Sequence, residues 1–153
     1  MPRLVREQFF PRPRSEIFGF FADASNLASI TPDFLHFTIL TPMPLDVRAG
    51  AIIDYRLRLF GIPFRWRTRI EAFEPPERFV DIQARGPYRR WHHLHEFEER
   101  DGGTLMRDTV DYALPLGPLG AAAHALFVRR SVARIFDHRR EVLARQFGRS
   151  LSE

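Results

Sequence analysis

Residues 78–97 read RFVDIQARGPYRRWHHLHEF, and this stretch decides the fold. It predicts two strands joined by a turn at Gly86-Pro87, because strand side chains point alternately to the two faces of a sheet. One face of this hairpin carries Phe79, Asp81 and Gln83 from the first strand, and Trp91, His93, His95 and Phe97 from the second. The aromatic side chains at the ends predict that this face is covered. The polar side chains between them then form a polar patch inside an apolar cavity, since buried polar groups need a partner.

The composition predicts one domain with a sizeable core. The chain has 153 residues, of which 44% are hydrophobic and 15 are Phe. We expect a single domain over residues 1–148 and a C-terminal tail over residues 149–153. The absence of cysteine excludes disulfides and thiolate chemistry. The sequence shows neither a signal peptide nor an apolar run of the roughly 20 residues that a membrane helix needs. We therefore expect a cytoplasmic protein without stable membrane insertion.

The remaining segments predict an antiparallel sheet and a long terminal helix. Alternating patterns and turn residues indicate strands at 4–10, 34–40, 51–60, 64–73, 78–84, 88–99 and 104–114. Two short helices follow the first strand, and the second of them spans residues 26–30. After a break at 115–120, a helix with an apolar stripe continues to about Phe147. The predicted class is therefore α+β, with a curved seven-stranded antiparallel sheet wrapped around the C-terminal helix.

The expected turns set the expected register. A turn at Gly61-Ile62 places Arg58 opposite Arg65 and Tyr55 opposite Thr68. Asp81 is expected opposite His93. In the last hairpin, Asp108 is expected opposite Phe97 and diagonal to His95, and Tyr112 opposite His93.

Two Asp–His combinations are therefore candidates for chemistry. An Asp that fixes the tautomer of a His raises its basicity, which suits a general base. The tentative catalytic residues are His93, His95, Asp81 and Asp108. The alternative is a structural pair that satisfies buried polar groups. The His-X-His spacing also permits a metal, but we expect neither a metal nor a cofactor, and no nucleophile elbow or phosphate loop is present.

Arginines form a second constellation. All 23 basic residues are Arg, and Arg56, Arg58, Arg65 and Arg67 share the outer face of two predicted strands. The favoured interpretation is a solvated face. The other is a surface for an anionic partner, which would make the protein an interaction module. No aromatic residues interleave with these arginines, so we expect no nucleic-acid partner.

The chain resembles the START/Bet v 1-like (SRPBCC) superfamily, within it the bacterial cyclase/dehydrase-like or ligand-binding group, over nearly its whole length. The residues that carry this resemblance are Asn26-Leu27, Ile30-Thr31-Pro32, Gly61-Ile62-Pro63, Trp66, Phe79-Val80-Asp81-Ile82-Gln83, Gly86-Pro87-Tyr88, Trp91-His92-His93-Leu94-His95-Glu96-Phe97 and Met106-Arg107-Asp108. The resemblance implies a helix-grip fold with a cavity for apolar or amphipathic small molecules.

The expected function is binding of an apolar or aromatic small molecule, such as a lipid, polyketide or quinone, in an internal cavity. The expected ligand-binding residues are Tyr55, Trp66, Thr68, Gln83, Trp91, Tyr112 and Arg139. Arg139 lies within the apolar stripe of the helix and has two open alternatives, to extend to solvent or to enter the cavity. The alternative function is a cyclase or dehydratase that uses a His base on a polyketide-like or carbonyl substrate. We expect a monomer or a weak homodimer.

Overall fold

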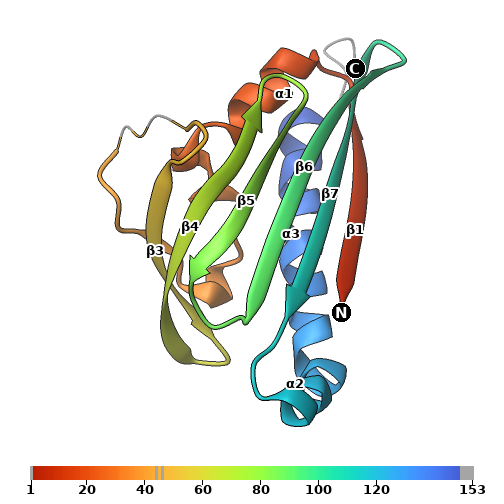
Figure 1. The fold of residues 1–153 in the computed structure, drawn as a ribbon. Helices are drawn as coiled ribbons and strands as arrows, with labels where there is room; N and C mark the ends of the chain where they lie inside the picture. Colours follow the sequence, from red (N-terminus) through yellow and green to blue (C-terminus); the bar gives the residue numbers. More distant parts are fainter. Residues whose placement is uncertain (1, 44, 46, 149–153) are drawn as a thin grey trace.

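The computed structural model describes residues 2–43, 45 and 47–148 (Figure 1). The predicted tail at 149–153 lies outside the described residues. The chain begins with β1 (Arg3–Phe10), α1 (Arg14–Phe21), the short 3₁₀ turns η1 (Ala24–Asn26), η2 (Ala28–Ile30) and η3 (Asp33–Leu35), and β2 (Thr38–Ile39). Strands β3 (Ile52–Leu59), β4 (Ile62–Glu74), β5 (Arg78–Arg85), β6 (Arg90–Arg100) and β7 (Gly103–Ala113) follow. The chain then forms α2 (Gly117–Ala123), the π-helical turn η4 (His124–Val128) and α3 (Arg129–Phe147).

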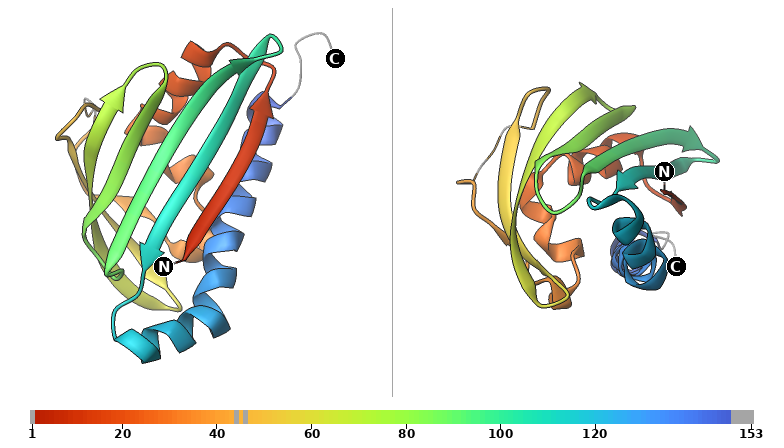
Figure 2. Two further views of the ribbon diagram at one scale, coloured as in Figure 1. Left: turned by 45° about the vertical axis from the view of Figure 1, so that its right-hand side comes forward. Right: turned by 60° about the horizontal axis from the view of Figure 1, so that its bottom comes forward.

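The seven strands form one antiparallel sheet in the order β1-β7-β6-β5-β4-β3-β2. The sheet curves around α3, which lies along its concave side (Figure 2). This arrangement confirms the predicted α+β helix-grip architecture. The alternation that predicted the strands is also visible in burial, since Val110 on β7 is buried and the neighbouring Asp111 is half-buried on the other face.

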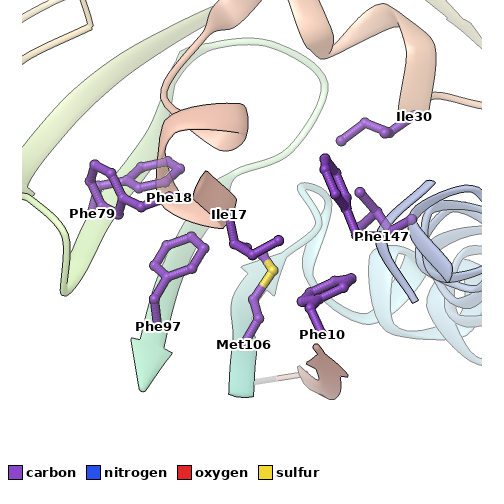
Figure 3. Close-up of a cluster of buried hydrophobic side chains, with 9 residues drawn as sticks. Phe10, Ile17, Phe18, Ile30, Phe79, Phe97, Met106 and Phe147 are labelled. Carbon is purple, nitrogen blue, oxygen red and sulfur yellow. The ribbon is translucent and has the colours of Figure 1, made fainter. Parts of the chain in front are cut away.

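Helix α3 packs on the sheet through the predicted apolar stripe, in which Val132, Phe136, Leu143 and Phe147 are buried. At one end of the sheet, α1 and the end of α3 close a core of aromatic and aliphatic side chains (Figure 3). Phe18 there contacts the rings of Phe73, Phe79 and Phe97 edge-on or tilted. This packing leaves the middle of the concave face for the site. No helix in the described part of the chain is long and apolar enough to cross a membrane.

Two hairpins differ in register from the sequence-based expectation. Arg56 lies opposite Arg65 and Tyr55 opposite Trp66, whereas His95 lies opposite Asp108 and Trp91 opposite Tyr112. Both turns are two-residue turns whose residues all have positive φ, Phe60-Gly61 at 53° and 78° and Asp101-Gly102 at 50° and 78°. Such turns place Gly in the second position, while the expected register requires Gly61 and Gly102 in the first. The resulting shift is two residues, so every side chain keeps its expected face.

Two segments also differ in secondary structure. The predicted strand 34–40 is reduced to β2, because Asp33–Leu35 forms a 3₁₀ turn after Pro32 and ends in a left-handed His36. The predicted break at 115–120 contains the start of α2. Pro118 is compatible with this helix because it stands in the first turn, where a backbone N–H has no helical partner.

The turn at Phe60 generates a prediction about stability. A left-handed conformation at a residue other than Gly, Asn or Asp costs roughly 1–2 kcal/mol, so Phe60→Asn should raise the free energy of unfolding by about 0.5–1 kcal/mol. Urea denaturation measures this change. The matched variant Gly61→Ala should be destabilised by about 1 kcal/mol, and an equal effect of both substitutions would contradict the assigned turn.

Candidate functional site

A cavity of about 160 Å³ lies between the inner face of the sheet, α3 and the segment that contains η1–η3. Its wall is mainly aromatic and aliphatic, and the sheet contributes Trp66, Trp91 and Phe79. The segment of 3₁₀ turns contributes Leu27, Ile30 and Leu35. His93, His95, Asp81 and Arg139 supply charged or titratable groups to the same wall. The polar patch inside an apolar cavity therefore exists as a spatial arrangement.

Most of the expected ligand-binding residues meet at this cavity. Tyr55, Trp66, Thr68, Trp91 and Arg139 all line it. The Tyr55 hydroxyl and the Thr68 hydroxyl are 2.9 Å apart and share a hydrogen bond. Ring stacking continues from Tyr55 to Trp66, whose ring meets Trp91 edge-on at 5.3 Å between centroids.

Gln83 and Tyr112 were also expected to contact a ligand in the cavity. The structure places neither side chain on the cavity wall. The Gln83 amide donates to the Tyr88 carbonyl oxygen and accepts from the Tyr88 backbone N–H, at 2.6 and 2.9 Å. It thereby fixes the loop between β5 and β6. The Tyr112 hydroxyl is 2.7 Å from His124 Nε2, which is on the π-helical turn η4, so this side chain joins the sheet to the terminal helix.

The two histidines and two aspartates form one compact network across β5, β6 and β7. Asp81 lies opposite His93 on the strand ladder, as expected, yet its Oδ2 is 2.5 Å from His95 Nε2 and 3.7 Å from His93 Nδ1. Asp108 lies opposite His95, yet its Oδ1 is 2.8 Å from His93 Nε2. Each aspartate thus forms its hydrogen bond to the diagonal histidine. The Asp108 oxygen is also 3.2 Å from His95 Nδ1, without the alignment of a hydrogen bond.

Aromatic stacking holds the imidazoles in place. The rings of His93 and His95 stack with centroids 3.7 Å apart and an interplanar angle of 27°. Phe79 stacks on the other side of His95 at 4.0 Å, and Phe136 from α3 meets His93 edge-on at 5.4 Å. Both histidine side chains are about 95% buried. Their orientation is therefore set by packing as well as by hydrogen bonds.

Burial and the neighbouring charges act in opposite directions on the pKa values of these four side chains, and their balance assigns a protonation state to each. Burial lowers the pKa of His93, and the neighbouring His95 lowers it further, so the neutral imidazole is favoured there. Burial acts against the cation at His95 too, but the adjacent carboxylates of Asp108 and Asp81 outweigh it and raise the pKa of His95. Burial would raise the pKa of Asp81 and of Asp108, but the two imidazoles outweigh it and hold both pKa values below the usual range.

The Arg139 side chain does not extend to solvent. It enters the cavity and forms part of its wall. Its guanidinium lies over the rings of Phe136 and Phe21, at 5.2 and 6.0 Å from their centroids. Nη1 is 3.9 Å from Asp108 Oδ1, and it has no hydrogen-bond partner among the described residues. With a cationic His95, the two aspartates and the two cations balance one another.

The metal-binding alternative meets a geometric obstacle. Asp81, His93 and His95 offer ligand atoms within 4.8 Å of one another. A metal bound by imidazole lies near the ring plane at about 2.0–2.1 Å from nitrogen. Two rings stacked with centroids 3.7 Å apart do not share such a point, so at least one of them would have to rotate out of its packed position. The expectation of no metal stays a prediction.

The network suits acid–base chemistry better. If His93 Nε2–H donates to Asp108, then Nδ1 is the basic atom of a neutral imidazole on the cavity wall. Asp108 would hold that tautomer, as an orienting carboxylate does beside a general base. Among the pairings of Asp81 and Asp108 with His93 and His95, His93 with Asp108 has the geometry of a base with its positioning residue.

Sequence reasoning missed the part of the wall that the 3₁₀ turns supply. Leu27, Ile30 and Leu35 line the cavity, but three-residue turns give no periodic pattern to detect. Tyr88 and Phe136 also line it, and they do have a signal, because Tyr88 follows the Gly86-Pro87 turn and Phe136 lies in the apolar stripe.

Comparisons with known proteins agree with this architecture. The sequence matches the family described as "Polyketide cyclase / dehydrase and lipid transport" over residues 10–138. A search of curated proteins returns no match. Protein CV1439 from Chromobacterium violaceum has a TM-score of 0.74 at 14% identity, covering 98% of this chain and 100% of that chain. TTHA0849 from Thermus thermophilus has a TM-score of 0.68 at 20% identity, covering 94% and 98%. Ara h 8.0201 has a TM-score of 0.61 at 16% identity, also covering 94% and 98%.

The network predicts a large difference between two aspartates. Asp108→Asn leaves a buried histidine without its carboxylate, and we expect the free energy of unfolding to fall by about 1–3 kcal/mol. Asp54→Asn is the matched control, because Asp54 forms an exposed ion pair with Arg67 and such pairs contribute about 0–1 kcal/mol. Chemical denaturation measures both. Equal losses would mean that the buried network contributes no more than a surface ion pair.

The raised pKa of His95 predicts a pH dependence. Because the folded-state pKa lies above the ordinary value of 6.5, the protonated His95 contributes stability that is fully present below that value and is lost as pH rises through the folded-state pKa. The destabilisation by His95→Gln should therefore be larger near pH 6 than near pH 9. Denaturation at both pH values measures it, and a loss that grows with pH would contradict the assignment.

Proposed function

The chain belongs to the polyketide cyclase/dehydrase and lipid transport family, and on this premise we propose that it binds a small aromatic or apolar molecule with acceptor oxygens in the cavity under α3. The family and the Bet v 1-like fold support ligand binding. The observation that carries the finer proposal is the combination of an aromatic cavity with unpartnered hydrogen-bond donors in its wall.

The cavity volume limits the size of the ligand. An apolar cavity of about 150 Å³ holds benzene, whereas pockets for drug-sized ligands measure about 300–1,000 Å³. The 160 Å³ of this cavity therefore fits roughly one aromatic ring. A quinone, lipid or polyketide of greater length would place one end inside and leave the remainder outside, or would move the 3₁₀ segment away from α3.

The unpartnered donors define the polar side of the ligand. Trp66 Nε1 and Arg139 Nη1 are buried and have no hydrogen-bond partner among the described residues, and both side chains line the cavity. An unsatisfied buried donor costs about 1–3 kcal/mol. A ligand oxygen that accepts from either donor removes that cost. Because the charges of Asp81, Asp108, His95 and Arg139 already balance, a neutral carbonyl suits the site better than a further anion.

An enzymatic alternative rests on the neutral His93. A hydrogen bond from Arg139 to the oxygen of a ligand carbonyl polarises the carbonyl group. The C–H bond on the adjacent carbon then becomes more acidic. His93 Nδ1 could take that proton while Asp108 stabilises the imidazolium. Proton abstraction next to a carbonyl is the first step of an aldol-type cyclisation or of a dehydration. This chemistry needs binding first, so binding is the primary proposal.

Two probes of equal size test the binding proposal. Acetophenone carries one ring and one carbonyl, whereas ethylbenzene lacks the acceptor. The two tryptophans of the chain, Trp66 and Trp91, both line the cavity, so tryptophan emission reports on its occupancy. We expect acetophenone to bind at least about tenfold more tightly than ethylbenzene, since a hydrogen bond to a charged group contributes about 1.5–3 kcal/mol.

Variants at neighbouring arginines identify the donor. Arg139→Met should bring the ratio of the acetophenone affinity to the ethylbenzene affinity close to one. Arg140→Met should leave this ratio unchanged, because Arg140 is exposed and donates to the Glu7 carbonyl oxygen. If neither probe changes the emission, the cavity is not a binding site for molecules of this size. If both probes bind equally well, the cavity is a binding site, but the proposed hydrogen bond from Arg139 to the ligand is wrong.

A further inference from the structure

Six large apolar side chains are exposed together at one end of the molecule, and we call this surface the apolar tip. The tip consists of Phe60, Ile62, Leu116, Leu119, Leu126 and Phe127, each between 56% and 74% exposed. The β3–β4 turn supplies Phe60, the start of β4 supplies Ile62, and the loop before α2, α2 and η4 supply the others. Both segments lie at the same end of the sheet (Figures 1 and 2), and the rings of Phe60 and Phe127 meet edge-on at 6.4 Å.

Two of these side chains stand at backbone positions that smaller residues would adopt more easily. Phe60 and Leu116 adopt left-handed backbone conformations, with φ of 53° and 73°, which Gly, Asn or Asp would adopt at lower cost. A large apolar side chain that is both exposed and conformationally unfavourable indicates a function at that position. The Leu119 and Leu126 face of the terminal helical segment is not covered by the sheet, and the structure leaves it exposed.

Arginines surround the tip. Arg58 lies on β3 just before the turn, Arg89 lies in the β5–β6 loop beside the end of β7, and Arg129 and Arg130 begin α3 directly after the tip. All four are exposed. The ion pairs found among the described residues include none of the four. The tip is therefore an apolar protrusion with a positively charged margin.

We propose that the apolar tip docks the protein reversibly on a lipid bilayer that contains anionic lipids. Leucine and phenylalanine would enter the boundary between headgroups and acyl chains, while arginine side chains bind the headgroups. The tip protrudes as a turn and a helix end, and such a shape suits a deformable bilayer. A second copy of the chain is disfavoured as the occupant, because it would bring two positively charged margins together.

The apolar tip adjoins the cavity wall, so docking on a bilayer would also bring the cavity close to the membrane surface. Leu59 lines the cavity and directly precedes Phe60. The same terminal helix that closes the cavity begins at the tip and contributes Ile135, Phe136 and Arg139 to the wall. Docking would therefore hold the cavity close to a reservoir of apolar molecules.

Flotation with lipid vesicles at physiological salt tests the proposal. We expect the protein to float with vesicles of phosphatidylglycerol and phosphatidylcholine, and to float less with phosphatidylcholine alone. Phe127→Ser should weaken binding to the mixed vesicles about tenfold, as expected for one lost buried aromatic side chain. The double variant Arg129→Gln with Arg130→Gln should weaken it by about tenfold or more, since each arginine near an anionic surface contributes about fivefold.

Matched variants exclude general effects. Phe9→Ser and Arg145→Gln remove an exposed Phe and an exposed Arg at the other end of the molecule, and both should bind like the parent. Phe60→Asn should bind vesicles more weakly although it is expected to be the more stable protein, which separates docking from loss of fold.

Because the chain has no cysteine, a single Leu126→Cys variant accepts an environment-sensitive fluorophore at the tip. Mixed vesicles should shift its emission to shorter wavelengths, and they should not shift that of an Arg145→Cys control. Absence of vesicle binding, or equal losses in the tip and control variants, would overturn the proposal. So would a lipid-free dimer, detected by sedimentation, that Phe127→Ser dissociates, because the tip would then be a contact between copies.

Discussion

The buried carboxylate of Asp108 and the half-buried carboxylate of Asp81, both on the covered face of the sheet, are the constraint on which the rest of the structure depends. A buried charge without a partner costs several kcal/mol, and Asp81 and Asp108 stand on the two strands that flank β6. His95 compensates them from the strand between, and Arg139 does so from the helix. The position of α3 along the sheet is therefore fixed by charge as well as by the packing of Val132 and Phe136. If α3 were displaced by one turn along its axis, the Arg139 guanidinium would no longer lie near Asp108.

The sequence predicted the faces of the strands better than their alignment. Side-chain direction repeats every two residues, so His93, His95 and Asp108 could be assigned to the inner face from parity alone. Alignment depends on which residue of a turn takes the left-handed conformation. The expected register requires Gly61 and Gly102 in the first position of their turns, and the structure places them in the second. Phe60 in a left-handed conformation has no sequence signal, because propensity argues against it.

The same distinction applies to the site. The convergence of Asp81, His93, His95 and Asp108 was predictable, and so was the aromatic wall of Tyr55, Trp66 and Trp91. The diagonal hydrogen bonds were not, because they depend on ring stacking between residues of one strand. Gln83 and Tyr112 share the inner parity with the cavity residues, but both lie toward the end of the sheet where loop and helix partners satisfy them. Parity gives a face, whereas position along the strand decides which neighbours a side chain meets.

The π-helical turn η4 lies between α2 and the part of α3 that closes the cavity. Successive residues of an α-helix are about 100° apart around its axis, so removing one residue from this turn would rotate α2 by about that angle relative to α3. Leu119 would then point to a different side, while Ile135, Phe136 and Arg139 would stay where they are. Over evolutionary time, homologous chains could therefore change the orientation of this end by single insertions or deletions and retain an unaltered interior.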